Sequence, residues 1–204
     1  MIASPMGQPF REQAMSDAEL RAHSVAEADL FFQAINCPKC GSGPVASAHS
    51  EEEPAGQGGA TRRADVGLCA SCGSELRFDF QISLSRHPDE PTLINPTDEP
   101  SRIIDLAQWI TLARVFVDRS SKTADPRQAR RLNLRAAECW GEALKFFDDP
   151  DNDLPPPEAF FCELSRERFR KHPGQFSRQQ LLHERSKLPS SPRPGGDPSS
   201  EKTR

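Results

Sequence analysis

The clearest alternation of hydrophobic and polar positions lies in ELRFDFQISL, residues 75–84. Apolar side chains occupy every second position from Leu76 to Leu84, and the positions between them are polar. Successive side chains of an extended chain point to opposite faces, so this segment has one apolar face and one polar face. The pattern predicts a half-buried β-strand, the most clearly marked strand of the chain.

Beyond residue 100 the apolar positions recur every three or four residues, which is the period of an amphipathic helix. The first such stripe contains Ile103, Leu106, Ile110, Ala113 and Val117, and the second contains Ala129, Leu132, Ala136, Cys139, Ala143 and Phe146. Asp125 followed by Pro126 is a typical helix start, and the connection before it is short. Two helices are therefore predicted to pack as an antiparallel hairpin, with Trp109 and Trp140 filling the core between them.

Three further helices are indicated by capping signals. Ser16 and Glu19 are spaced as a capping box and predict a helix toward Phe31, although SVAE at 24–27 can equally start it. After the hairpin, Pro157 can begin a third helix, EAFFCELSRERFRKH, which Pro173 ends. Ser177 can cap a short last helix that runs through Leu188.

Polar and proline-rich segments divide the chain. Residues 1–15 and 189–204 are predicted to be disordered ends, and residues 88–100, with four prolines, to be a linker. The linker separates a first unit, residues 16–87, from a helical domain, residues 101–188. Within the first unit, residues 46–63 are rich in Glu, Gly and Ala and predict a long flexible loop. These elements together predict an α+β fold: a small β-sheet followed by a helical hairpin or small helical bundle.

Composition and charge narrow the function classes. The 204 residues carry a net charge of -4, but residues 1–98 hold 7 Lys and Arg against 14 Asp and Glu, whereas residues 99–204 hold 19 against 16. The acidic first half weighs against phosphate binding there. The start of the chain lacks the basic and apolar regions of a secretory signal, and polar residues interrupt the most apolar segment. We therefore expect a cytoplasmic protein with no membrane role.

Four of the six cysteines form two closely spaced pairs with the pattern C-x2-C-x28-C-x2-C: Cys37, Cys40, Cys69 and Cys72. A two-residue gap lets both thiolates of a pair turn inward on one tight loop, and two facing loops complete a tetrahedral site suited to Zn²⁺. Each pair is followed by glycine, Gly41 and Gly73, where a positive φ lets backbone N–H groups point at the sulfurs. The pattern predicts a tetrathiolate metal site.

CPKCG at residues 37–41 and CASCG at residues 69–73 resemble the zinc-ribbon families over roughly residues 33–84. The resemblance implies a small β-sheet whose hairpins carry the ligands, with GPVASA and ADVGL as the strands that flank the long loop. It also implies one structural Zn²⁺ per chain. On this reading the chain is similar to a bacterial-type zinc-ribbon protein with a C-terminal helical domain.

Several alternatives remain for the cysteine pairs. A thioredoxin-like redox pair needs a Cys-x-x-Cys at the start of a helix after a strand, and neither pair has that context. Iron uses the same four-sulfur geometry, and the spacing does not separate it from zinc. Four buried cysteines without metal are a third reading, and His49 or His87 can replace a cysteine as ligand. Four thiolates close the coordination sphere, so we expect a structural rather than a catalytic metal.

The other candidates for chemistry are less specific. Cys139 and Cys162 are predicted to be packing residues, because no spacing selects His172 or His183 as a base for either thiol. Neither a phosphate-binding glycine loop nor a G-x-S-x-G motif occurs. We therefore expect that the chain is not an enzyme.

A basic segment near the C-terminal end supplies the alternative function. Arg166, Arg168, Arg170 and Lys171, with phenylalanines between and after them, can contact nucleic acid, or they can form a solvated helix face. The expected function is that of a structural zinc-binding protein acting as a protein-interaction module. The alternative is a nucleic-acid-binding zinc ribbon associated with transcription or RNA.

Overall fold

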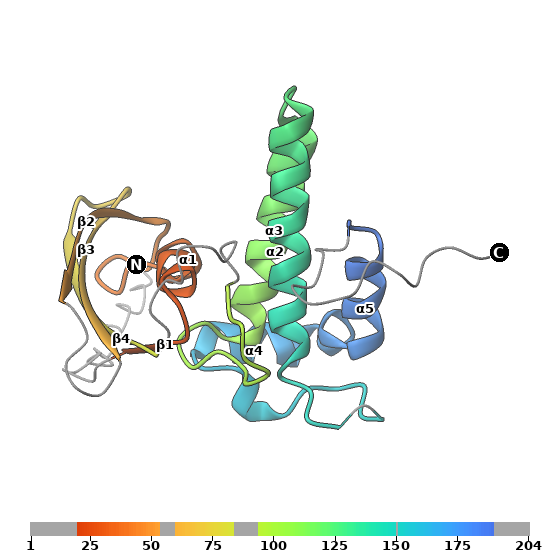
Figure 1. Cartoon of the computed structure of the whole chain (residues 1–204). Helices are drawn as coiled ribbons and strands as arrows, with labels where there is room; N and C mark the ends of the chain where they lie inside the picture. The colour runs from red at the N-terminus through yellow and green to blue at the C-terminus, as the bar shows by residue number, and fades with distance from the viewer. Residues whose placement is uncertain (1–19, 54–59, 84–93, 150, 190–204) are drawn as a thin grey trace, which may run out of the picture.

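The computed structural model describes residues 20–53, 60–83, 94–149 and 151–189, and these residues form a mixed sheet beside a group of helices (Figure 1). The strands are β1 (Leu20–Ala22), β2 (Val45–Glu53), β3 (Thr61–Cys69) and β4 (Glu75–Ile82), in the order β1-β4-β3-β2. β1 pairs with β4 in parallel, and the other neighbours are antiparallel. The predicted α+β fold is confirmed.

Helix α1 (Val25–Ala34) packs on the apolar face of β4, which the alternating pattern predicted. Phe31 and Phe32 of α1 meet Phe78 edge to face, with ring centroids 5.3 Å and 5.4 Å apart, and all three rings are buried. Such aromatic pairs contribute about 0.5–1.5 kcal/mol each beyond their buried area. This cluster is the core of the sheet region, and it fixes the helix that leads into the first cysteine pair.

The sequence offered two possible starts for α1, the capping box at Ser16 and SVAE at residues 24–27, and the structure shows which one is used. Ser24 is the N-cap, and its hydroxyl accepts a hydrogen bond of 3.1 Å from the backbone N–H of Glu27. The helix therefore begins within SVAE. A helix continuing from Ser16 is wrong for residues 20–22, which lie in β1, and residues 16–19 lie outside the described part of the chain.

The helical region is built on an antiparallel hairpin of α2 (Leu106–Lys122) and α3 (Pro126–Leu144). Asp125 caps α3 as predicted, and Trp109 and Trp140 are buried. Short helices follow: η1 (Pro157–Ala159), α4 (Glu163–Lys171), η2 (Pro173–Phe176) and α5 (Arg178–Ser186). Ser177 caps α5, which was also predicted. The third helix is shorter than predicted, because only one 3-10 turn follows Pro156 and the α-helix begins after Cys162.

The sheet region and the helical region touch through specific contacts. Gln108 of α2 donates from Nε2 to the carbonyl oxygen of Ala34 at 3.3 Å, and the Ser24 hydroxyl donates to the carbonyl oxygen of Ile94. Ile94 and Asn95 are buried, so residues 94–100 of the predicted linker lie against the body of the protein; residues 88–93 lie outside the described residues. Whether the two regions fold independently stays a prediction.

Residues 46–63, predicted to be a flexible loop, are a strand hairpin wherever the structure describes them. Residues 46–53 belong to β2 and residues 61–63 to β3, with Glu53 opposite Arg62. The prediction failed because all of β2 after Val45 is exposed, so no buried face produces an apolar alternation. The predicted disordered ends lie, apart from Pro189, outside the described residues. None of the described helices is long and apolar enough to cross a membrane.

Candidate metal centre

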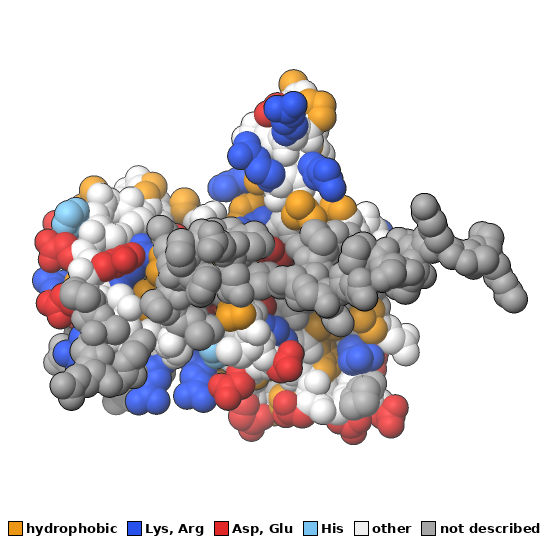
Figure 2. Space-filling view, in the orientation of Figure 1, with side chains coloured by type: hydrophobic (Ala, Val, Ile, Leu, Met, Phe, Trp, Pro, Cys, Tyr) orange, Lys and Arg blue, Asp and Glu red, His pale blue; other side chains and the backbone are white. Residues whose placement is uncertain are grey.

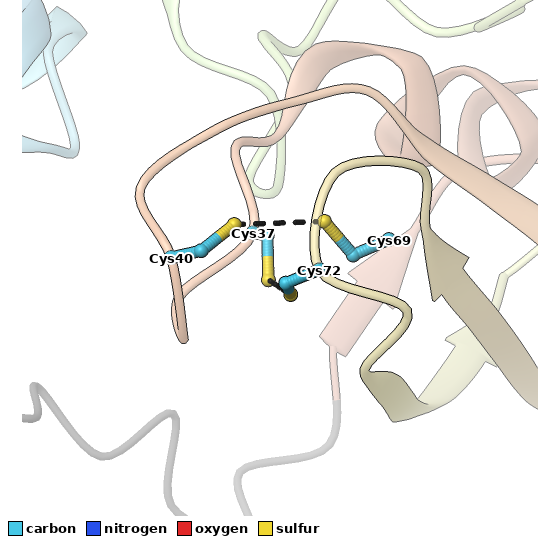
Figure 3. A group of neighbouring side chains, drawn as sticks. All are labelled: Cys37, Cys40, Cys69 and Cys72. Atoms are coloured by element: carbon cyan, nitrogen blue, oxygen red, sulfur yellow. Dashed lines mark hydrogen bonds between the residues drawn. The ribbon is translucent and has the colours of Figure 1, made fainter.

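Two turns at one end of the sheet bring the four paired cysteines together. Cys37 and Cys40 lie between α1 and β2, while Cys69 ends β3 and Cys72 lies in the turn that leads to β4. The register of β2 and β3 sets Val45 opposite Cys69, so the turn before β2 faces the turn after β3. Figure 3 shows the four thiols pointing toward one another from these two turns.

The two turns have the same backbone geometry. In each one, the N–H of the first cysteine donates to the serine five residues later, at 2.6 Å to Ser42 and 3.0 Å to Ser74. The N–H of the glycine donates back to the first cysteine at 2.8 Å and 2.9 Å, and Gly41 and Gly73 have φ values of 71° and 68°. Other residues are strained in this left-handed region, which explains why glycine follows both pairs.

The sulfur positions match a tetrahedral metal site. Cys37 and Cys72 have Sγ atoms 3.8 Å apart, Cys40 and Cys69 have Sγ atoms 3.6 Å apart, and all four lie within 4.8 Å of one another. A tetrahedron with metal–sulfur bonds of about 2.3 Å has edges of about 3.8 Å. Disulfides require about 2.05 Å between sulfurs, so these contacts are not covalent bonds. The cluster has the size and shape to hold one metal ion.

The electrostatics of the cluster favour thiolates at the second turn. The Ser74 hydroxyl and backbone N–H lower the pKa of Cys72 to about 6, and the backbone N–H groups of Cys72 and Ser71 lower the pKa of Cys69. The backbone N–H of Ser42 lowers the pKa of Cys40, but burial and the three neighbouring sulfurs outweigh it and raise this pKa to about 11. Four sulfurs at this separation cannot all carry charge without a cation among them.

The candidate ligands of the cluster are all sulfur atoms. Cys37 and Cys69 are buried, and Cys40 and Cys72 are exposed. His49 points instead to Glu51, 3.2 Å away, with its side chain 65% exposed, and His87 lies outside the described residues. Among the described residues no other group of three or more Cys, His, Asp or Glu side chains is placed to hold a metal.

The two remaining cysteines occupy different surroundings. Cys139 is fully buried in the hairpin, and burial raises the pKa of its thiol far above the usual range. Cys162 is half-buried at the start of α4, with Sγ 3.8 Å from Asp105 Oδ2 and 3.2 Å from Ser165 Oγ. No contact joins either thiol to His172 or His183 within the described part of the chain.

The basic residues predicted from α4 have partners within the chain. Arg166 and Arg170 both pair with Glu163, and Arg166 also donates to the carbonyl oxygen of Phe161 at 3.0 Å. Arg168 donates to the Thr111 hydroxyl at 3.0 Å, and Lys171 lies 3.6 Å from Glu167. Carboxylates therefore partly neutralise Arg166, Arg170 and Lys171, whereas the partner of Arg168 is an uncharged hydroxyl.

Two groups of polar and charged residues were not predicted from the sequence. One is a buried cluster where the sheet and helices meet, formed by His23, Glu27, Asn95, Glu142 and Lys145. The other is a set of exposed arginines at the end of the α2–α3 hairpin. The buried cluster is assembled from segments distant in the sequence, and the arginines come from two different helices. The only sign of either group in the sequence is the excess of arginine between residues 114 and 131.

No protein-family model, curated protein or solved structure matches this chain. The resemblance to zinc ribbons therefore rests on the two cysteine motifs and on the geometry of the two turns.

Proposed function

We propose that the four-cysteine cluster binds one structural Zn²⁺ and that the chain is a non-catalytic module for binding another protein. The observation that carries the zinc assignment is the gathering of four Sγ atoms within 4.8 Å of one another, with two separations, 3.6 Å and 3.8 Å, close to the edge of a zinc–thiolate tetrahedron. All-thiolate tetrahedral sites suit Zn²⁺, and iron is the competitor that shares this geometry.

A structural role follows from the ligand set. Four protein ligands leave no coordination position for water or substrate, whereas hydrolytic zinc sites keep one position open. The metal would instead join the turn after α1 to the turn between β3 and β4. Because a small sheet region has a limited core, part of its folding free energy would come from binding the ion.

A binding role is supported by the side chains around the groove and the buried cysteine in the described part of the chain. A groove of about 470 Å³ beside α2 and α3 is lined by Arg114, Asp118, Trp140 and Glu184 among others, with no cysteine or histidine. Cys139 is buried and held as a neutral thiol, so it is a poor nucleophile.

Two exposed apolar side chains favour a protein partner. Leu164 is 55% exposed and Phe161 is 39% exposed, three residues apart at the start of α4. Removing apolar surface of this kind from water is favourable and contributes to the affinity of protein–protein interfaces. We propose that they form part of the contact surface.

Two experiments separate the parts of this proposal. Substituting Co²⁺ should give the absorption spectrum of a tetrahedral thiolate complex, and a six-coordinate spectrum would overturn the site. For the partner, a tagged chain should be purified from cells with its associated proteins quantified. Leu164→Asp should lose partners that the wild type retains, whereas Leu182→Asp on α5, where the leucine is 39% exposed, should keep them. If the wild type and both variants retained the same partners, the α4 surface would not be the site of protein binding.

A further inference from the structure

The end of the α2–α3 hairpin is a strongly basic projection. Residues 114–131 contain six basic residues, all exposed, against two acidic residues: Arg114, Arg119, Lys122, Arg127, Arg130 and Arg131 against Asp118 and Asp125. Figure 1 shows the two helices extending beyond the rest of the molecule, and Figure 2 shows Lys and Arg side chains gathered on that extension. We call these five arginines and Lys122 together the hairpin arginine surface.

Within the described hairpin, the two aspartates of residues 114–131 do not form ion pairs with the arginines of this surface. Lys122 pairs with Asp118 at 2.7 Å, and the Asp125 side chain accepts from the backbone N–H of Arg127 as the N-cap of α3. The five arginines make no side-chain ion pair with any residue of the described part of the chain. This distinguishes them from Arg166 and Arg170 of α4, which share Glu163.

The helical spacing gathers these charges. Arg127, Arg130 and Arg131 are separated by three and four residues on α3 and so lie on one helix face. On α2, Arg119 and Lys122 are three residues apart, close to the end of the helix that precedes α3. The antiparallel packing therefore places both sets at the same end of the hairpin, whereas Arg114 lies midway along α2 and lines the groove with Asp118 and Glu184.

We infer that the hairpin arginine surface binds the phosphate backbone of a nucleic-acid duplex. Guanidinium groups bind phosphates through paired hydrogen bonds and are less strongly hydrated than ammonium groups, which favours arginine for this contact. The surface is convex and projects from the body, so it suits an extended anionic partner rather than a small ligand. This activity is separate from the zinc site and from the protein contact proposed at α4.

The composition of the projection argues against other anionic partners. Protein interfaces need a desolvated apolar centre, but Val117, 39% exposed, is the only large hydrophobic residue counted as exposed on the described hairpin. Single strands are held by aromatic stacking, and the only ring at residues 114–131, Phe116, is buried. Membrane-surface helices likewise use apolar side chains that insert into the lipid. A duplex requires only charge at the right spacing.

The salt dependence of binding gives a quantitative expectation. If Arg119, Arg127, Arg130 and Arg131 each neutralise one phosphate of a DNA duplex, the slope of log K against log salt concentration is about −3.6. Raising the salt from about 50 mM to about 200 mM should then weaken binding roughly 150-fold. Each arginine removed from a phosphate contact should reduce the slope by about 1.

Two variants with the same change in net charge provide the test. Arg127→Gln/Arg130→Gln/Arg131→Gln removes three charges from the hairpin, and Arg166→Gln/Arg168→Gln/Arg170→Gln removes three from α4. Arg127 lies in the first turn of α3, where the helix dipole disfavours a cation, so the hairpin variant should fold. Fluorescence anisotropy with labelled 20-base-pair DNA and RNA duplexes of arbitrary sequence measures binding, with metal content and thermal melting checked on every sample.

The proposal expects that the wild type binds at least one of the two duplexes with the steep salt slope. The hairpin variant should bind at least tenfold more weakly with a slope reduced by about 3, and the α4 variant should behave as the wild type. Failure of the wild type to bind either duplex, or loss of binding in the α4 variant alone, would overturn it. Equal or tighter binding to phosphatidylserine vesicles, or hairpin-dependent self-association without duplex binding, would assign the surface to a membrane or to a second copy instead. In each of these cases the metal content reports separately on the zinc proposal.

Discussion

Replacing Glu142 with glutamine should change how the stability of the protein depends on pH. Glu142 of α3 is 5% exposed, its Oε1 lies 2.8 Å from Lys145 Nζ, and its Oε2 accepts from Asn95 Nδ2 at 3.1 Å. Lys145 also donates to the carbonyl oxygens of Asn95 and Thr97, at 3.1 Å and 2.6 Å. The carboxylate thus ties α3 to residues 94–97 between the sheet and the helices.

Burial raises the pKa of Glu142 from 4.5 to about 7; the pairing with Lys145 opposes this rise, and the carboxylate of Glu27 adds to it. The folded state therefore keeps a proton that the unfolded chain loses above about pH 4.5. Stability falls as pH rises through this window and levels off above pH 7. One pKa unit corresponds to about 1.36 kcal/mol, so the loss is at most about 3 kcal/mol.

The assay is urea unfolding of wild type and Glu142→Gln between pH 5 and pH 8, followed by the fluorescence of the two buried tryptophans. Glutamine does not titrate, so the variant should gain up to about 3 kcal/mol relative to wild type as pH rises, whatever its stability at pH 5. Effects of pH on the cysteines cancel in this difference. Leu182→Ala changes no titratable group and should differ from wild type by the same amount at every pH.

A difference between wild type and Glu142→Gln that does not change with pH would refute this account of the buried cluster. A difference of the opposite sign, with the variant losing relative stability as pH rises, would mean that the attraction of Lys145 outweighs burial.

Three further substitutions test the fold and the metal site. Cys69→Ser should abolish metal binding and unfold the sheet region while the tryptophan-reported hairpin stays folded, and simultaneous loss of both would refute independent domains. Gly67→Ala should cost about 1–3 kcal/mol in thermal or urea unfolding, because a Cβ there would lie 2.6 Å from Val45 Cγ1 and 2.8 Å from a ring carbon of Phe32; unchanged stability would mean that Val45 and α1 both shift freely. Arg63→Leu should cost about 3–5 kcal/mol, since it leaves the fully buried carboxylate of Asp65, now 2.9 Å from Arg63 Nε, without its cationic partner and, among the described residues, with only the Ser50 hydroxyl as a donor. A cost below about 1 kcal/mol would show that water reaches Asp65.

The sequence allowed prediction of elements whose signals are local. The alternation in β4 was visible because Leu76, Phe78, Phe80 and Ile82 are all buried on one face. The caps at Asp125 and Ser177 were visible because each one satisfies backbone N–H groups two or three residues away. The cysteine pairs were visible because the two cysteines and the glycine of each turn lie within five consecutive residues.

Elements that depend on distant partners could not be predicted. β1 has three residues and exists through its parallel pairing with β4, about 60 residues later. β2 is exposed and acidic after Val45, and it is a strand because β3 supplies its hydrogen bonds. The convergence of arginines from α2 and α3 likewise depends on packing that no single segment encodes.

Elemental analysis of the purified protein, with thiol titration before and after chelation, tests the central claim most directly. The account predicts one zinc per chain and four further reactive thiols once a chelator removes it, because Cys139 is buried and Cys162 is not a ligand. Iron in place of zinc, or fewer than four thiols protected by the metal, would contradict a closed structural zinc site.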